Sequence, residues 1–444
     1  MSDKSPAPAQ TMGFWMALAL VVGSMIGSGV FLLPASLAPL GWNSVLGWLV
    51  TIAGTLCMAA VFARLARAFP SAGGPYAFTR EAFGRPPAFM VAWAYWISLW
   101  TGNAAIAIAA VSYLSRLVPG LADMASLGAV AIVWLLTAIN LRGVRAVGGV
   151  QMVTTVLKLV PLVAVFGIAA VVLTTASPSP LAPFDAGDLS LGQVNTAAIL
   201  ALWAMLGIET ATVPADKVRD PERTVPRATL IGTAPAGAIY LFVCSAVVLM
   251  LPADQTAQSA APFADFVARY VGGDWALLVA AAGAISALGA LNGWILVQAE
   301  VPHAMAKDGA MPVPLARSSA TGVPVVSHLV SSGLLTVAVL LNYSRSMAGL
   351  FEFMILLSSA ITLVMYVGVA LAAARLIVGG RLAAGLGFRA IVLVAFVYSV
   401  WTVFGAGLEA VGWGAALVLA GLPLYLFMGK SGPAQQPAKE TAVR

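Results

Sequence analysis

Charged residues are scarce in this chain. Of its 444 residues only 9% are Asp, Glu, Lys or Arg, whereas 61% are hydrophobic. Because about 25% of the residues of an average soluble domain are charged, this composition excludes a soluble globular protein. The period-2 alternation of a membrane β-barrel is also missing. The chain is therefore predicted to be an all-α integral membrane protein.

Cysteine and histidine are also rare. The two cysteines, Cys57 and Cys244, lie inside apolar runs, where a thiol behaves as a small hydrophobic group. The two histidines, His303 and His328, lie near predicted helix ends without the spacing of metal ligands. The sequence therefore predicts no disulfide framework, no metal site and no cofactor.

Motifs of catalytic and nucleotide-binding sites are absent from the sequence. There is no Ser/His/Asp set, no His-Glu-x-x-His and no phosphate-binding P-loop. The basic residues are scattered over short loops, so they do not form the basic, aromatic-rich face that binds nucleic acid. An enzyme or receptor embedded in the membrane is kept only as a remote alternative, and nucleic acid is not an expected partner.

Long apolar runs are what the chain has in abundance. A bilayer-spanning helix needs roughly 20 residues, and the sequence has about twelve such runs, at 12–37, 42–63, 88–115, 124–141, 148–173, 195–215, 228–252, 275–301, 323–342, 347–374, 388–407 and 410–428. The first run has no basic n-region and no small-residue cleavage site, so it is predicted to be a retained helix. Polar tails at 1–11 and 430–444 flank this polytopic domain of residues 12–429.

The basic residues are distributed unequally between the two sides of these runs. If the helices alternate from a cytoplasmic N-terminus, nineteen of the 23 Lys and Arg residues lie in inner loops and tails. Only Arg116, Arg269 and Arg345 fall in outer loops, and Lys158 lies inside a run. The positive-inside rule then places both termini in the cytoplasm, with the protein in a plasma or bacterial inner membrane.

Glycine-rich breaks interrupt two of the runs at corresponding places. Gly23-Ser-Met-Ile-Gly-Ser-Gly29 lies in the first run, and Gly207-Ile-Glu209 lies in the sixth. Broken helices at matching positions of two halves are typical of secondary transporters, in which half-helix N-termini offer N–H groups to the substrate near the membrane midplane. We expect two inverted five-helix repeats, at about 12–173 and 195–374, followed by two extra helices at about 388–428.

Two ionisable residues lie deep within the apolar runs, where a charge costs about 2.5–3.5 kcal/mol on insertion scales. Glu209 follows the second break and is interpreted as a substrate-sensing, gating or proton-carrying carboxylate; alternatively, it only ties loose backbone N–H groups. Lys158, near the middle of the fifth run, is too deep to snorkel. It is interpreted as a proton-coupling ammonium facing a polar cavity, or equally as a brace between helices.

Two tryptophans and one asparagine are candidate substrate contacts. Trp203 precedes the second break, and Trp294 follows a helix face of small residues. An indole over a cation contributes about 0.5–2 kcal/mol, which suits an amine or guanidinium. Asn103 is an uncharged polar group deep in the third run, where it could contact a substrate or hydrogen-bond a neighbouring helix.

Four ordered motifs carry a resemblance to a known family. They are Gly27-Ser-Gly29-Val-Phe-Leu-Leu-Pro34, Ser71-Ala-Gly-Gly74-Pro-Tyr76-Ala-Phe78, Leu202-Trp-Ala-Met-Leu-Gly207-Ile-Glu209-Thr-Ala-Thr212 and Lys307-Asp308-Gly309. From about Gly13 to Lys430 the chain resembles the amino acid–polyamine–organocation superfamily. Within it, the chain is most similar to basic amino acid/polyamine antiporters, especially arginine/agmatine antiporters. The resemblance implies a LeuT-like 5+5 inverted repeat with broken helices 1 and 6, alternating access and often a homodimer.

The resemblance also implies a set of substrate-binding residues. The substrate's carboxylate and amine would lie at the first break, and its side chain near the third, sixth and eighth helices, with Glu209 as the gating carboxylate. The implied contacts are Met25, Ile26, Ser28, Gly29, Ser98, Asn103, Trp203, Met205, Gly207 and Trp294.

Two departures from the antiporter pattern are expected. Near Leu356-Leu357-Ser358-Ser359 a leucine is expected in place of the serine that those antiporters offer to the substrate head. Lys158 is more similar to the fifth-helix lysine of proton-coupled permeases.

Two functional hypotheses of the same fold remain open. The leading one is an antiporter that exchanges a cationic, arginine-like amino acid for its decarboxylated amine, such as agmatine or a polyamine. The alternative is a proton-coupled permease for neutral amino acids that uses Lys158. Both move a small molecule across a lipid bilayer, and neither is an enzyme.

Overall fold

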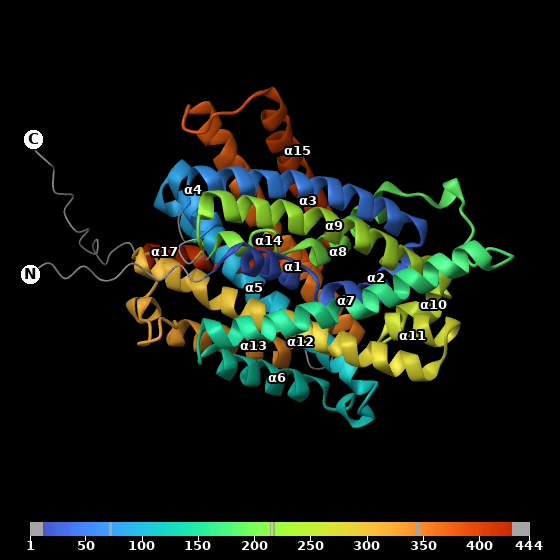
Figure 1. The fold of residues 1–444 in the computed structure, drawn as a ribbon. Coiled ribbons are helices and arrows are strands. Elements are labelled where there is room, and N and C mark those ends of the chain that lie inside the picture. Colours follow the sequence, from blue (N-terminus) through green and yellow to red (C-terminus); the bar gives the residue numbers. More distant parts are fainter. Residues whose placement is uncertain (1–11, 71–72, 214, 216–217, 342–346, 429–444) are drawn as a thin grey trace, which may run out of the picture.

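The chain folds into a bundle of helices (Figure 1). The computed structural model describes residues 12–70, 73–213, 215, 218–341 and 347–428, with the side chains of 28–29, 144–153 and 155–156 left out. Within these ranges the only β-type pairing is an isolated bridge between Met12 and Val218. The tails 1–11 and 430–444 lie outside the described residues.

Seventeen α-helices are found in the described ranges. They are α1 (Phe14–Met25), α2 (Ser28–Leu37), α3 (Trp42–Ala68), α4 (Pro75–Phe83), α5 (Arg85–Ser115), α6 (Ala125–Asn140), α7 (Val144–Thr175), α8 (Leu191–Met205), α9 (Pro221–Met250), α10 (Ala253–Ala257), α11 (Pro262–Tyr270), α12 (Gly273–Lys307), α13 (Val325–Leu341), α14 (Met347–Val378), α15 (Leu386–Val403), α16 (Gly407–Leu419) and α17 (Gly421–Met428). Short 3-10 turns join some of them, among them η4 (Thr210–Thr212) and η6 (Val313–Ala316).

Many of these helices are suited to a membrane. Among the described residues, eight helical stretches are long and apolar enough to cross it, and three shorter apolar helices, α6, α8 and α13, accompany them. The last long stretch, Leu386–Met428, contains α15 to α17 and so holds both of the last two predicted runs. The prediction of an all-α multi-pass membrane protein is confirmed.

One boundary differs clearly from the sequence prediction. The seventh run was expected to begin near residue 228, but α9 already begins at Pro221. Proline fits the first turn of a helix because its missing N–H would have no partner there. Residues 221–227 therefore form about the first two turns of α9.

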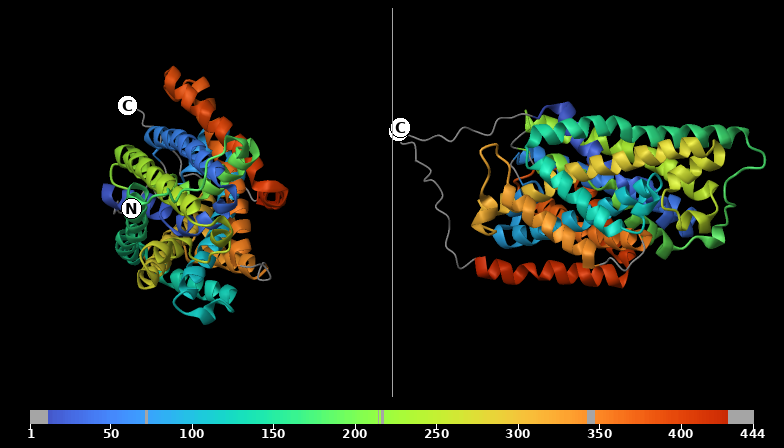
Figure 2. Two further views of the ribbon diagram at one scale, coloured as in Figure 1. Left: turned by 90° about the vertical axis from the view of Figure 1, so that its right-hand side faces the viewer. Right: turned by 90° about the horizontal axis from the view of Figure 1, so that it is seen from below.

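The long helix α5 lies at the centre of the bundle and packs against α12 and α14 (Figure 1). On another side, α3 packs against α8 and α9. The helices α15 to α17 lie along one edge of the bundle (Figure 2). Of the predicted site residues, α5 itself carries Ser98 and Asn103, and the neighbouring helix α12 carries Trp294.

Both predicted breaks are present in the backbone. Between α1 and α2, Ile26 and Gly27 are extended, and after α8 the chain is extended at Leu206 and has a φ of 120° at Gly207. The two breaks lie against each other, because a Cβ on Gly207 would come within 3.1 Å of Met25 Cγ. Glycine suits this position both for its positive φ and for the close approach.

Polar side chains tie several elements together at one end of the bundle. Asp308, directly after α12, accepts a short hydrogen bond from Tyr76 of α4, and its carboxylate lies 2.6 Å from Arg80. Arg381, in the connection between α14 and α15, pairs with Glu81 of α4. Burial and the bond to Asp308 raise the pKa of the Tyr76 phenol, so this hydroxyl remains a donor. The end of α12 and the α14–α15 connection are thereby held against α4.

Candidate substrate-binding site

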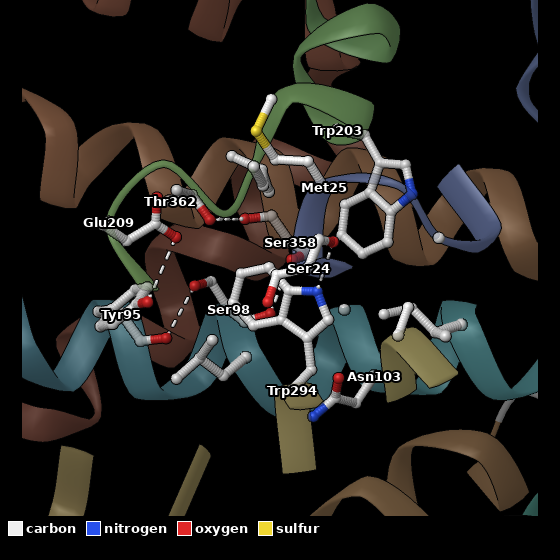
Figure 3. Close-up of a pocket in the computed structure, with 16 residues that line it drawn as sticks. Ser24, Met25, Tyr95, Ser98, Asn103, Trp203, Glu209, Trp294, Ser358 and Thr362 are labelled. Atoms are coloured by element: carbon white, nitrogen blue, oxygen red, sulfur yellow. Dashed lines mark hydrogen bonds between the residues drawn. The ribbon is translucent and has the colours of Figure 1, made fainter. Parts of the chain in front are cut away.

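A cavity of about 450 Å³ lies where the two breaks meet α5, α12 and α14 (Figure 3). Segments distant in the sequence supply its wall, because each broken helix leaves a gap that the neighbouring helices close. Its lining residues are Ser24, Met25, Gly27, Tyr95, Ser98, Leu99, Gly102, Asn103, Ile106, Trp203, Leu206, Glu209, Ala290, Trp294, Ser358 and Thr362.

Glu209 is the one acidic residue in this lining, and among the described residues that line the cavity none is Lys, Arg or His. Its side chain is only 1% exposed. Each carboxylate oxygen accepts a hydrogen bond of 3.2 Å, one from the Tyr95 hydroxyl and the other from the Tyr366 hydroxyl. The two tyrosines, from α5 and α14, therefore hold an acidic group at the wall of the cavity.

The predicted tryptophans approach the cavity from different helices. Trp203 extends from α8 and Trp294 from α12 (Figure 3). The Trp294 indole N–H donates to the Ser24 carbonyl at 3.1 Å, which ties α12 to the end of α1. By contrast, the indole nitrogen of Trp203 and the Ser24 hydroxyl are buried without a hydrogen-bond partner in the described part of the chain.

Three further polar side chains lie along α5 and α14. The Ser98 hydroxyl donates to the Tyr95 carbonyl, and the Ser358 hydroxyl donates to the Ser98 carbonyl, both at 2.7 Å. Asn103 donates from its amide nitrogen to Gln298 of α12 at 2.7 Å. The two serine hydroxyls have their single hydrogens directed at protein acceptors, and one N–H of Asn103 is bound to Gln298, so all three groups have oxygen lone pairs left for a ligand.

Several predicted contacts lie near the cavity without lining it. Ile26 and Gly207 form the extended backbone of the two breaks, and Met205 is fully buried in α8, with its Cε near Gly237 of α9. The side chains of Ser28 and Gly29 are outside the described part, although the backbone of α2 begins at Ser28. The first three residues shape the wall around the cavity, and the contacts predicted for Ser28 and Gly29 remain predictions.

Lys158 is fully buried in α7 and does not line the cavity. Its ammonium donates to the Gly23 carbonyl at 2.5 Å. This carbonyl is among the last four of α1, which lack a helical N–H partner where the helix stops. The structure thus gives Lys158 the bracing contact that was one of its two interpretations.

The predicted replacement of the antiporters' serine in the tenth run stays a prediction, but a serine of this run does reach the cavity. Ser358 lines the cavity, whereas Leu357 does not and packs beside Ala94 and Ile97 of α5. Successive residues of an α-helix are about 100° apart around its axis, so an alignment shifted by one residue replaces a cavity position with a packing position. Ser358 therefore supplies a hydroxyl at this wall of the cavity.

Sequence reasoning missed several lining residues, including Tyr95, Thr362 and Ala290. Hydroxyls and alanines are common in membrane helices, so their composition gives no signal. For Tyr95 a usable signal was helical spacing. Tyr95, Ser98 and Gly102 follow one another at intervals of three and four residues, on the face of α5 that also carries Asn103.

Comparison with known proteins agrees with this architecture. Residues 12–418 match the family model described as amino acid permease. The chain belongs to the amino acid permease family. It is 34% identical over 348 residues to the cadaverine/lysine antiporter of Escherichia coli strain K12, which covers 77% of each chain.

Two further relatives align over nearly the whole permease. The putrescine transporter PotE of Haemophilus influenzae is 28% identical over 95% of this chain and 98% of its own. A putative arginine/ornithine antiporter of Bacillus subtilis is 29% identical over 94% of this chain and 96% of its own. The family and these relatives are transporters, so this permease is a transporter of small molecules and not an enzyme.

Proposed function

We propose that this permease is an antiporter that exchanges a cationic amino acid for its decarboxylated amine by alternating access. The observation that carries the proposal is the acidic cavity. It has one buried carboxylate, Glu209, and two indoles, Trp203 and Trp294, with no basic side chain among its described lining residues. An ammonium or guanidinium is attracted by a carboxylate and by the faces of indole rings. The relatives named as cadaverine/lysine and arginine/ornithine antiporters support the same substrate class.

The two breaks suggest how the substrate would be held. We propose that the amino acid's carboxylate and amine bind at the break before α2, whose N-terminus presents free N–H groups and a positive dipole end. The side chain would then extend between Trp203 and Trp294 toward Asn103. Because a decarboxylated amine retains the cationic head, it would occupy the same cavity on the return step.

The repeat division and the membrane orientation are part of this proposal. We assign the two inverted repeats to residues 12–173 and 195–374, with extra helices at 388–428, and both termini to the cytoplasm of a bacterial inner membrane. The end that carries Arg80 and Arg381 would face the cytoplasm. Arg116, which pairs with Asp265 near the other end of α5, would face outside.

We further propose the lipid bilayer and a second copy of the chain as partners. Large apolar side chains such as Phe404, Leu408 and Trp413 are well exposed on the helices at the edge of the bundle. They need an apolar neighbour, which lipid and a second copy both supply. Native mass spectrometry of the protein released from lipid nanodiscs would give twice the chain mass for a homodimer and the single-chain mass if it is absent.

Uptake into liposomes containing the purified protein tests the exchange. Labelled arginine and labelled lysine are offered outside, and the lumen is left empty or preloaded with arginine, lysine, agmatine or cadaverine. We expect uptake only with a preloaded lumen. Equal uptake into empty and preloaded liposomes would contradict antiport.

A proton-coupled permease for neutral amino acids is the second candidate, because the Lys158 ammonium contacts the Gly23 carbonyl at the first break. A proton lost from this lysine would release α1, which could couple protons to transport. That hypothesis predicts leucine uptake driven by a proton gradient, and Lys158→Ala would uncouple it. Absence of gradient-driven uptake of neutral amino acids would remove the hypothesis.

A further inference from the structure

A chain of hydrogen bonds leads from the cavity to the far side of the bundle. The Asn103 amide nitrogen donates to Gln298 Oε1 at 2.7 Å, and Gln298 Nε2 donates to the Ser332 hydroxyl of α13 at 3.3 Å. The Ser332 and Thr137 hydroxyls are 2.8 Å apart, and Thr137 of α6 donates to the Val133 carbonyl at 2.8 Å. Asn103, Gln298, Ser332 and Thr137 are each at most 1% exposed.

The donors and acceptors along this series of hydrogen bonds can be assigned in only one way if every bond is made. A backbone carbonyl only accepts, so the single hydrogen of Thr137 is committed to Val133 and its oxygen must accept from Ser332. Ser332 then has no hydrogen left and accepts from the Gln298 NH₂ group. Gln298 must therefore turn its oxygen toward Asn103, which donates its own NH₂ group in return.

This assignment of donors and acceptors decides whether the oxygen or the nitrogen of the Asn103 amide faces the cavity. The Asn103 nitrogen is bound to Gln298, and the Asn103 oxygen has no hydrogen-bond partner among the described residues. This oxygen is not fully enclosed by protein, unlike the other buried polar atoms that lack a partner in the described part of the chain. Figure 3 shows the nitrogen turned away from the other lining residues and the oxygen turned toward them. Asparagine oxygen and nitrogen are nearly equal in size, so shape alone would not set this orientation.

We infer that Gln298, Ser332 and Thr137 are positioning residues that fix the Asn103 amide with its carbonyl oxygen toward the substrate, so that the cavity selects a head group that only donates hydrogen bonds. The inference rests on the proposed function and adds a source of its specificity. Ammonium and guanidinium groups are donor-only. A carbamoylated analogue, citrulline for arginine or homocitrulline for lysine, places a carbonyl oxygen in the head group and would meet a second acceptor at Asn103.

The same region provides a matched control. Ser331, adjacent to Ser332 on α13, is also fully buried and donates to the Gln298 backbone carbonyl at 3.1 Å while accepting from Trp96 at 2.9 Å. Ser331→Ala therefore removes one buried hydroxyl and two hydrogen bonds without touching the amide of Gln298. Ser332→Ala removes a comparable group but breaks the chain that fixes the amide.

The test measures equilibrium affinities of the purified full-length protein for arginine and citrulline, and for lysine and homocitrulline, by competition with a labelled ligand. The readout is the ratio of cation affinity to analogue affinity, which a general folding defect would not change. We expect this ratio to fall about tenfold in Gln298→Leu and at least about threefold in Ser332→Ala. It should stay near the wild-type ratio in Ser331→Ala and in Ser332→Thr, which keeps the hydroxyl.

The outcomes separate this inference from the proposed function. If wild type prefers the cation and the affinity ratio is unchanged in Ser332→Ala and Gln298→Leu, the positioning role is overturned and the proposed function stands. Wild type that binds neither cation more tightly than its analogue would overturn both. If Gln298→Leu fails to fold, the comparison of Ser332→Ala with Ser331→Ala still decides the matter, because an equal fall in both would also overturn the inference.

Discussion

Gly102 of α5 lies where the Trp203 ring and the Ser358 hydroxyl come closest to the backbone. A Cβ at this position would be 2.8 Å from Trp203 Cη2 and 2.9 Å from Ser358 Oγ, which is too close for both. Because an indole is rigid, the ring must move when a methyl group is added. We therefore expect Gly102→Ala to cost about 1–3 kcal/mol of stability and to weaken substrate binding roughly tenfold.

Thermal unfolding in detergent and ligand competition would measure the two effects. Gly167→Ala in α7 is the matched control, because a Cβ there meets no atom within 4 Å. Unchanged binding in Gly102→Ala would show that Trp203 does not need its present position.

The sequence predicted some site residues and missed others for a physical reason. Glu209 and Trp203 could be predicted because a charge or a large aromatic beside a helix break is rare and needs an explanation, and Trp294 because it follows a helix face of small residues. For Tyr95 the one signal was its helical spacing with Ser98 and Gly102. The place of Ser358 could not be predicted, because it depends on the rotation of α14 about its own axis. That rotation is set by packing against neighbouring helices.

At the scale of elements, the two breaks work as a pair. Gly207 has a φ of 120°, and a Cβ on it would meet Met25 and Ser24 at 3.1–3.2 Å. A side chain in such a backbone conformation costs about 1–3 kcal/mol. We expect Gly207→Ala to lose most of its exchange activity, because the added strain and the contact push the two breaks apart.

Liposome exchange and thermal unfolding of the same preparations would test this expectation. Gly333→Ala in α13, where a Cβ has open space, should exchange at the wild-type rate. Wild-type exchange by Gly207→Ala would mean that the close approach of the breaks is dispensable.

The sequence predicted the positions of these breaks but not what stabilises them. The glycines mark where α1 and α8 end, since unwound backbone favours residues without a side chain. The partner of Lys158 could not be predicted, because it depends on which carbonyl the end of α1 leaves free and on the packing of α7 against α1. Only the assembled bundle identifies that carbonyl as Gly23.

For the molecule as a whole, the orientation in the membrane is the property that the charge distribution predicts. Arg317 and Arg269 are both exposed, the first after the 3-10 turn η6 and the second in α11. The positive-inside rule places Arg317 in the cytoplasm and Arg269 outside. We expect Arg269→Cys to react with a membrane-impermeant maleimide in intact cells, and Arg317→Cys only after the membrane is opened.

Both variants are made in a chain whose native Cys57 and Cys244 have been replaced, so that each has one thiol. The parent chain without cysteine controls for background labelling. The opposite labelling pattern would invert the proposed topology.

The central claim is that the acidic cavity selects cationic substrates through Glu209. The most direct test is the affinity of purified wild type and Glu209→Gln for arginine, lysine and their carbamoylated analogues, with Glu352→Gln, an exposed carboxylate of α14 outside the cavity, as control. The account predicts that Glu209→Gln weakens binding of the cations by about ten- to a hundredfold while analogue binding and the control stay unchanged. Cation binding by Glu209→Gln as tight as that of wild type would contradict it.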